Sequence, residues 1–159
     1  MAVKARKPVI GWREWVSLPG MGLHAIKAKV DTGARTSSLH ACKIQSYREK
    51  GAEMVRFTVQ PVQRRKDIAI TYIAEISDRR HVTDSGGHRE KRIVIATPIR
   101  LAGREWEIEM TLTNREDMMF RMLIGRTAMR SHVIIDPSKS FLHGQLSHED
   151  VCKIYEEED

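Results

Sequence analysis

The chain has 159 residues, which suffices for one domain with a core of its own. No apolar run approaches the roughly 20 residues of a membrane span, the N-terminus lacks a signal peptide, and two cysteines are too few for a disulfide framework, so we expect a cytoplasmic protein without membrane partners. The net charge is +6, but residues 149–159 hold six acidic residues and one lysine (−5), so the remaining chain carries +11. Such a body favours a polyanionic or acidic partner.

Period-two alternation of apolar and polar residues predicts a mainly β domain, with glycines at the turns. The expected strands, in chain order, cover residues 10–18, 23–31, 37–44, 54–59, 68–75, 79–83, 89–97, 105–112, 122–125 and 133–136. A short helix is expected over 127–131, and Ser147-x-x-Asp150 resembles a capping box at the start of a C-terminal helix. We divide the chain into a basic extension, one domain, and a C-terminal helix with an acidic tail, over residues 1–8, 9–144 and 145–159.

One of these strands ends in a motif with catalytic potential, Asp31-Thr32-Gly33-Ala34. A carboxylate on a glycine turn at a strand end can act as an acid or base, although Asp-x-Gly also simply begins turns. About ninety residues later the strand Met122–Ile124 runs into Gly125-Arg126, and between the two motifs lies a glycine-tipped hairpin at 84–88. Together these three elements resemble a retropepsin-like aspartic protease.

The resemblance is closer to one family, the RimB-like proteins, which are also labelled ATP-dependent zinc proteases and are associated with RimK-type ligases. It spans roughly Val9 to Gly144, and the segments that carry it are 11–15, 26–41, 111–115, 122–126 and 135–140. It implies a retropepsin-like closed β-barrel with a glycine-tipped flap hairpin and a short helix. It also implies a peptidase that trims the glutamates that RimK-type ligases add to a small-subunit ribosomal protein.

A single Asp-Thr-Gly motif is half of an aspartic protease, because two carboxylates must share a proton. The sequence has no second copy, so we expect a symmetric homodimer in which each subunit supplies Asp31, Thr32 and Gly33 as catalytic residues. Asp136, which precedes a proline, is the rival partner within a monomer. Ala34 has no hydroxyl to hydrogen-bond a charged dyad, so activity is expected nearer neutral pH.

Arginines gather on the predicted hairpin and near the catalytic motif, and arginine forms bidentate pairs with carboxylates. Residues expected to contact an acidic peptide substrate are Ala34, Arg35, Arg79, Arg80, Ser85, Gly86, Gly87, Arg89, Arg92 and Arg115. The alternative for the hairpin arginines is a solvated surface that protects a strand edge, and for Arg115 a structural role. We interpret Arg126 as structural.

Two other functions stay open at this point. A zinc peptidase would agree with the family label, but there is no His-Glu-x-x-His, and His40 with Cys42 supplies only two ligands, so we expect no metal. There is no ATP-binding Gly-x-x-x-x-Gly-Lys-Ser/Thr loop either, so we expect no cofactor. A non-catalytic ribosome- or RNA-binding module is the third reading, although aromatic residues are only 6% and none interleaves with the arginine cluster.

The expected partners are a second copy of the chain, an acidic peptide or glutamylated ribosomal protein, and a RimK-type ligase. The tail Tyr155–Asp159 is itself acidic and resembles the expected substrate. It is therefore expected either to compete weakly for a basic cleft or to serve only as a solubilising end.

Overall fold

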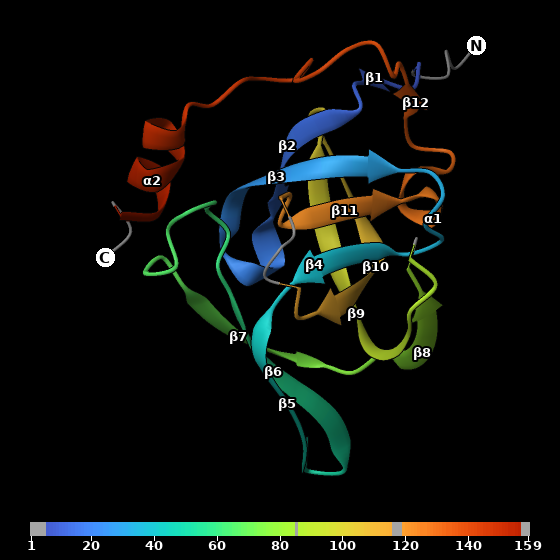
Figure 1. Ribbon diagram of the computed structural model, residues 1–159, viewed down its shortest axis with the longest axis vertical. Helices are drawn as coiled ribbons and strands as arrows, with labels where there is room; N and C mark the ends of the chain where they lie inside the picture. Colours follow the sequence, from blue (N-terminus) through green and yellow to red (C-terminus); the bar gives the residue numbers. More distant parts are fainter. Residues whose placement is uncertain (1–5, 85, 116–118, 157–159) are drawn as a thin grey trace, which may run out of the picture.

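The computed structural model describes residues 6–84, 86–115 and 119–156, and it is mainly β, as the sequence predicts (Figure 1). The helical elements are η1 (Pro19–Met21), α1 (Arg126–Met129) and α2 (His148–Glu156). The strands are β1 (Val9–Ile10), β2 (Arg13–Leu18), β3 (Leu23–Asp31), β4 (Ser37–His40), β5 (Cys42–Glu49), β6 (Ala52–Val59), β7 (Ile70–Glu75), β8 (Asp78–Thr83), β9 (Arg89–Leu101), β10 (Arg104–Thr113), β11 (Met122–Gly125) and β12 (Ile134–Ile135).

Six strands pair in a ring-like sheet. Their order is β10, β4, β11, β3, β2 and β9, and β9 pairs back onto β10, with β8 attached to the outer edge of β9. The contact between β2 and β9 is a single register pair, Ser17 with Arg100. All six ring strands contribute apolar side chains to one buried cluster, among them Ile26, Leu39 and Met110. The ring-like sheet is thus held together by its core.

The strand expected over 37–44 is wrong as a single element. β4 ends at His40 and β5 begins at Cys42, and β5 belongs to a separate three-stranded sheet of β5, β6 and β7. This second sheet extends away from the ring at the bottom of Figure 1. The chain changes direction here, because Lys43 takes a left-handed backbone with φ of 51° and the register between β5 and β6 is interrupted.

The C-terminal helix begins at the predicted capping box. The Asp150 N–H donates to Ser147 Oγ at 3.0 Å, and the Ser147 N–H donates to Asp150 Oδ2 at 3.1 Å. Val151 and Tyr155 are buried, and the Tyr155 hydroxyl donates to the carbonyl of Ala25 in β3. Hydrogen bonding and apolar burial therefore fix α2 to the ring. Among the described residues, no helix is both long and apolar enough to cross a membrane.

A buried carboxylate explains the Gly-Trp-Arg-Glu-Trp segment near the N-terminus. Glu14 is 0% exposed and accepts N–H groups from Gly11 at 2.8 Å, Leu142 at 2.9 Å and His143 at 3.2 Å. A Cβ at Gly11 would lie 2.2 Å from the carbonyl oxygen of Lys139, so only glycine permits this approach. The motif therefore clamps the segment before α2 onto β2, and its role is structural.

Candidate active site

Asp31 is the last residue of β3 and lies beside the end of β11. The two strands are parallel, with Val30 opposite Ile124 and Asp31 opposite Gly125. β11 also pairs with β4, so it lies between the strand that leads into the Asp31 turn and the strand that leaves it. The structure thus brings the two motifs of the sequence, ninety residues apart, to one place.

The turn after Asp31 holds one of its two carboxylate oxygens. Oδ1 accepts the N–H groups of Gly33 at 3.1 Å and Ala34 at 3.2 Å. Asp31 is half-buried and Thr32 is exposed. Within the part of the chain that the structure describes, Oδ2 of Asp31 makes no hydrogen bond. This oxygen is the one that can meet water or a second carboxylate.

The start of α1 donates hydrogen bonds to the turn that follows Asp31. The N–H of Arg126 donates to the carbonyl of Ala34 at 2.9 Å, and its Nη1 donates to the carbonyl of Gly33 at 3.2 Å. Both the N–H and the hydroxyl of Thr127 donate to the carbonyl of Arg35, the hydroxyl at 2.7 Å. These bonds satisfy the carbonyls of a solvent-facing turn. The structural reading of Arg126 agrees with this position.

A network of hydroxyls under the turn was missed by the sequence reasoning. The N–H of Gly125 donates to the buried Oγ of Ser37 at 3.0 Å, and Ser38 Oγ lies 3.1 Å from Thr111 Oγ1. A Cβ at Gly125 would lie 2.6 Å from the carbonyl carbon of Thr36. The available signal was the Ser-Ser pair in β4, whose residues are buried on both faces. In a strand of that kind, every hydroxyl needs a partner.

The predicted hairpin is formed by β8 and β9, with Thr83 opposite Arg89. At its tip, Asp84 Oδ1 accepts the N–H groups of Gly86 and His88, each at 2.9 Å, and these bonds to backbone N–H, that of His88 first, lower the pKa of Asp84. Gly87 has a φ of +84°, which favours glycine. Ser85 of the predicted substrate set lies outside the described residues.

Three of the predicted substrate-binding arginines are engaged by this chain's own side chains. Arg79 Nη1 bonds Glu53 at 3.1 Å, and Arg80 bonds both Asp78 and Glu109, the Glu109 bond being the largest cause that raises the pKa of Arg80. Arg92 is buried and donates to Ser38 Oγ at 3.1 Å and Glu90 Oε2 at 3.2 Å. Arg92 thereby ties the hairpin base to the hydroxyl network. The buried position of Arg92 agrees better with a structural role at the hairpin base than with contact to a substrate.

Arg35 and Arg89 differ from these three. Both are exposed, Arg35 in the Asp31 turn and Arg89 at the hairpin tip, and neither forms an ion pair within the described ranges. Arg115 was expected near the dyad, but it follows β10 at the end where Thr113 lies opposite His40, and its N–H donates to His40 Nδ1 at 3.1 Å. The structure therefore does not bring its backbone to Asp31.

The structure also places Asp136, the alternative partner of Asp31, and the two candidate metal ligands His40 and Cys42. Asp136 Oδ1 accepts both the N–H and the hydroxyl of Ser138, at 3.0 and 2.6 Å, and the hydroxyl bond is the largest cause that lowers the pKa of Asp136. His40 is buried in β4, whereas Cys42 begins β5 in the other sheet. Among the residues that the structure describes, no group of three or more His, Cys, Asp or Glu side chains is placed to hold a metal ion.

A strand-end Asp-Thr-Gly turn, packed against a hydrophobic strand that ends in Gly-Arg within a ring of β-strands, is the arrangement of a retropepsin-like protein. The family model described as "Retropepsin-like aspartic endopeptidase RimB" matches residues 9–145, so the chain belongs to the RimB-like family. The resemblance drawn from the sequence is thereby confirmed.

Longer proteins contain a segment similar to this chain. A "Probable alpha-L-glutamate ligase" of Shewanella halifaxensis is 45% identical over 149 residues, which cover 94% of this chain and 32% of that protein. Another of the same name, from Desulfotalea psychrophila, is 42% identical over 159 residues, covering 100% of this chain and 34% of that protein. The chain spans about a third of the length of these curated relatives.

A solved structure has a similar fold. It is the crystal structure of a Legionella pneumophila protein described as having unknown function, with a TM-score of 0.73 and 29% sequence identity. The match covers 86% of this chain and 98% of the Legionella chain. The ring of strands is thus shared across nearly the whole length of that protein.

Proposed function

We propose that the protein is a homodimeric aspartic peptidase that hydrolyses acidic C-terminal tails, with poly-glutamate as the substrate class. The observation that carries the proposal is the geometry of Asp31. Its Oδ1 is fixed by two backbone N–H groups, while Oδ2 makes no hydrogen bond among the described residues, and α1 donates hydrogen bonds to the carbonyls of the turn. A carboxylate held in this way is positioned for proton transfer.

In the proposed dimer, a two-fold axis sets Asp31 of each subunit against its mate, and the pair shares one proton. The unprotonated carboxylate takes a proton from water, and the water oxygen attacks the carbonyl carbon of the scissile peptide bond. The protonated carboxyl gives its proton to the carbonyl oxygen. Proton transfer to the amide nitrogen then accompanies cleavage of the C–N bond. Neither a metal nor a cofactor is needed for this sequence of steps.

Three features support an acidic substrate. The chain outside residues 149–159 carries +11, so it attracts polyanions. Arg35, one turn residue beyond Ala34, and Arg89, at the hairpin tip, are exposed and open to substrate carboxylates, and we assign them the role first expected of the larger arginine set. Segments similar to this chain also occur within proteins named as glutamate ligases, which links the family to glutamate chemistry.

Incubation with a peptide that ends in several glutamates, followed by mass spectrometry, tests the proposal. We expect loss of glutamate from the wild-type reaction, no loss with Asp31→Asn, and no cleavage of the same peptide with glutamines in place of the glutamates. Sedimentation at assay concentration should show a dimer. Cleavage that persists in Asp31→Asn and stops after chelation would instead establish the zinc peptidase.

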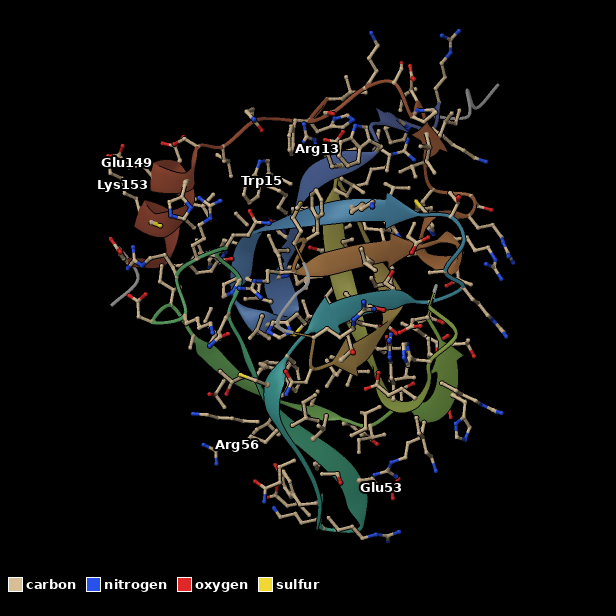
Figure 2. The ribbon with its side chains drawn as sticks, viewed as in Figure 1. Arg13, Trp15, Glu53, Arg56, Glu149 and Lys153 are labelled. Carbon is tan, nitrogen blue, oxygen red and sulfur yellow. The ribbon has the colours of Figure 1, made fainter. Side chains whose placement is uncertain are left out.

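If the Asp31→Asn protein binds the glutamate peptide and the wild type never cleaves it, the non-catalytic module is favoured. Arg35→Gln and Arg89→Gln should each raise KM for the acidic peptide, with little effect on kcat. Arg56→Gln is the matched control, because Arg56 is exposed on β6 of the second sheet and lies in neither motif of the candidate site (Figure 2).

A further inference from the structure

A cavity with both polar and apolar walls lies at the opposite end of the strand pair that carries Asp31. It has a volume of about 260 Å³, below the roughly 300–1,000 Å³ of pockets for drug-sized ligands, so it suits a small ligand or one side chain. It lies where the start of β11, the middle of β3, the loop after β6 and α2 meet. Its walls include Trp15, Lys27, Gln63, Arg64, Arg121 and His148.

Arg121 is the unusual member of this cavity. The residue is 7% exposed, and its Nε is buried without a hydrogen-bond partner. Its backbone carbonyl accepts the N–H of His40 at 2.8 Å, so the residue is held in place from the main chain. Throughout the described ranges no carboxylate pairs with its guanidinium. A buried nitrogen of a cationic group without a hydrogen-bond partner destabilises the folded state, which calls for a reason to keep it.

Among the described residues, the surroundings of Arg121 add positive charge, and no unpaired carboxylate lines the cavity. Lys27 Nζ lies 5.4 Å from the centroid of the Trp15 ring, and Arg64 is exposed at the rim. The acidic residues of the neighbouring loop and helix already have partners. Asp67 and Glu156 both bond Arg65, Asp150 bonds Ser147, and Glu149 bonds Lys153 on the outer face of α2 (Figure 2). The charged side chains among the described residues that line the cavity are therefore basic.

We propose that this cavity binds a carboxylate-bearing ligand, whose carboxylate pairs with the guanidinium of Arg121 while Lys27 and Arg64 contribute further positive charge. The Trp15 ring offers an apolar wall for the methylene groups of such a ligand. The site is separate from the candidate active site, because Lys27 precedes Asp31 by four residues, or about 13 Å along an extended strand. The proposal does not depend on Asp31 being catalytic.

Two sources present this chemistry, a free acidic amino acid and an acidic polypeptide tail. Binding is measured on the full chain by tryptophan fluorescence and by Tm, with L-glutamate, a tetraglutamate peptide, and a tetraglutamine peptide with an amidated C-terminus as probes. The Asp31→Asn background prevents cleavage, so a failed peptidase does not affect the result. A Tm rise of about 5–10 °C is expected at a ligand concentration 100 times Kd.

Three variants distinguish binding in the cavity from non-specific attraction to the basic surface of the protein. Arg121→Gln should abolish the Tm rise, and Arg64→Gln should reduce the affinity several-fold, while the matched control Arg56→Gln leaves the affinity unchanged. Response to L-glutamate alone identifies a free amino acid as the ligand, and response to tetraglutamate alone identifies a polypeptide tail. Equal binding of the tetraglutamine peptide, or binding that survives Arg121→Gln, would overturn the proposal.

Ligand-free stability supplies an independent measurement. If Arg121 is kept for a ligand, Arg121→Met removes a cation that no described carboxylate pairs, together with its buried, unpartnered Nε, and the Tm of the ligand-free protein should rise. If the guanidinium instead stabilises the fold, the Tm should fall. A fall in Tm together with no response of the wild-type chain to either acidic probe would leave Arg121 structural and the proposal wrong.

Discussion

The two ends of the β3–β11 strand pair contrast in how their charged groups are satisfied. At one end, Asp31 is half-buried, its Oδ1 accepts two N–H groups, and the neighbouring backbone is supported by α1 and Ser37. At the other end, Arg121 is buried more deeply and its Nε has no partner. The first end shows the fixed geometry that catalysis requires, and the second shows the uncompensated charge that binding an anion would satisfy.

The contrast shows that several of the family motifs stabilise the fold around Asp31 and are not themselves proposed to react. The Gly-Arg motif at the end of β11 places a backbone N–H and a guanidinium donor of Arg126 on the Asp31 turn, and the Gly-Trp-Arg-Glu-Trp motif holds the segment before α2. Arginines that look alike in the sequence also differ, because Arg79, Arg80 and Arg92 have internal partners whereas Arg35 and Arg89 are exposed. Arg35 and Arg89, which form no ion pair within the described ranges, are the arginines proposed to contact an acidic peptide.

The largest expected effect is on turnover and compares two strand-end carboxylates. Asp31→Asn should lower kcat for the acidic peptide by about 10²- to 10⁴-fold, because proton transfer is lost. Asp136→Asn should leave kcat near the wild-type value, since Asp136 is occupied by Ser138. Steady-state kinetics with the melting temperature as a folding control measure both. Equal losses in the two variants would support a monomeric pair of these residues instead of the dimer.

The next effect concerns the close approach that positions Asp31. In Gly125→Ala the new Cβ would lie 2.6 and 2.8 Å from backbone atoms of Thr36 and Ser37, which cannot move aside as a flexible side chain can. We expect a loss of about 1–3 kcal/mol in the free energy of unfolding and a fall in turnover. Denaturant unfolding measures the first. Gly20→Ala is the matched control, because its Cβ would lie 3.3 Å from a proline ring atom and should cost less.

A loss of stability that involves no new steric contact is expected from the hydroxyl network. Ser37→Ala leaves the buried N–H of Gly125 without its acceptor, at a cost of about 1–3 kcal/mol in the free energy of unfolding. In Ser17→Ala, a hydroxyl that donates to the carbonyl of His24 at an exposed site is removed, and water can replace it. Urea unfolding of the two variants provides the comparison. A Ser17 loss as large as that of Ser37 would contradict the importance of burial here.

The smallest effect is a pH dependence at the loop beside the Arg121 cavity. The hydrogen bond from Arg65 is the largest cause that lowers the pKa of Asp67 from 3.8 to about 2. The ionised Asp67 therefore favours the folded state above about pH 4, and this contribution is lost as the pH falls toward 2. The Tm difference between wild type and Asp67→Asn should shrink over that interval. The effect is small because the Asp67–Arg65 pair is exposed. A Tm difference that stays constant over this pH interval would contradict the prediction.

The sequence alone predicted much of this protein. Its β class, the strand 23–31, the hairpin at 84–88, the helix cap at Ser147 and the RimB-like family follow from local patterns, because alternation, turn residues and capping chemistry act between near neighbours in the chain. The Asp31 and Gly125-Arg126 motifs were also recognised from the sequence. Their contact across two parallel strands is a long-range pairing that only the folded ring supplies.

The tertiary structure decided what each charged side chain does. Nothing in the sequence separates Arg92, which is buried against Ser38, from the exposed Arg89 three residues earlier, and nothing marks Arg121 as a residue whose Nε is buried without a hydrogen-bond partner. The break at Ala41, where the chain leaves the ring for the second sheet, was likewise missed. Local patterns determine which segments become strands, whereas burial and pairing depend on which distant strands meet, and those contacts determine whether a charge supports the fold or stays available to a ligand.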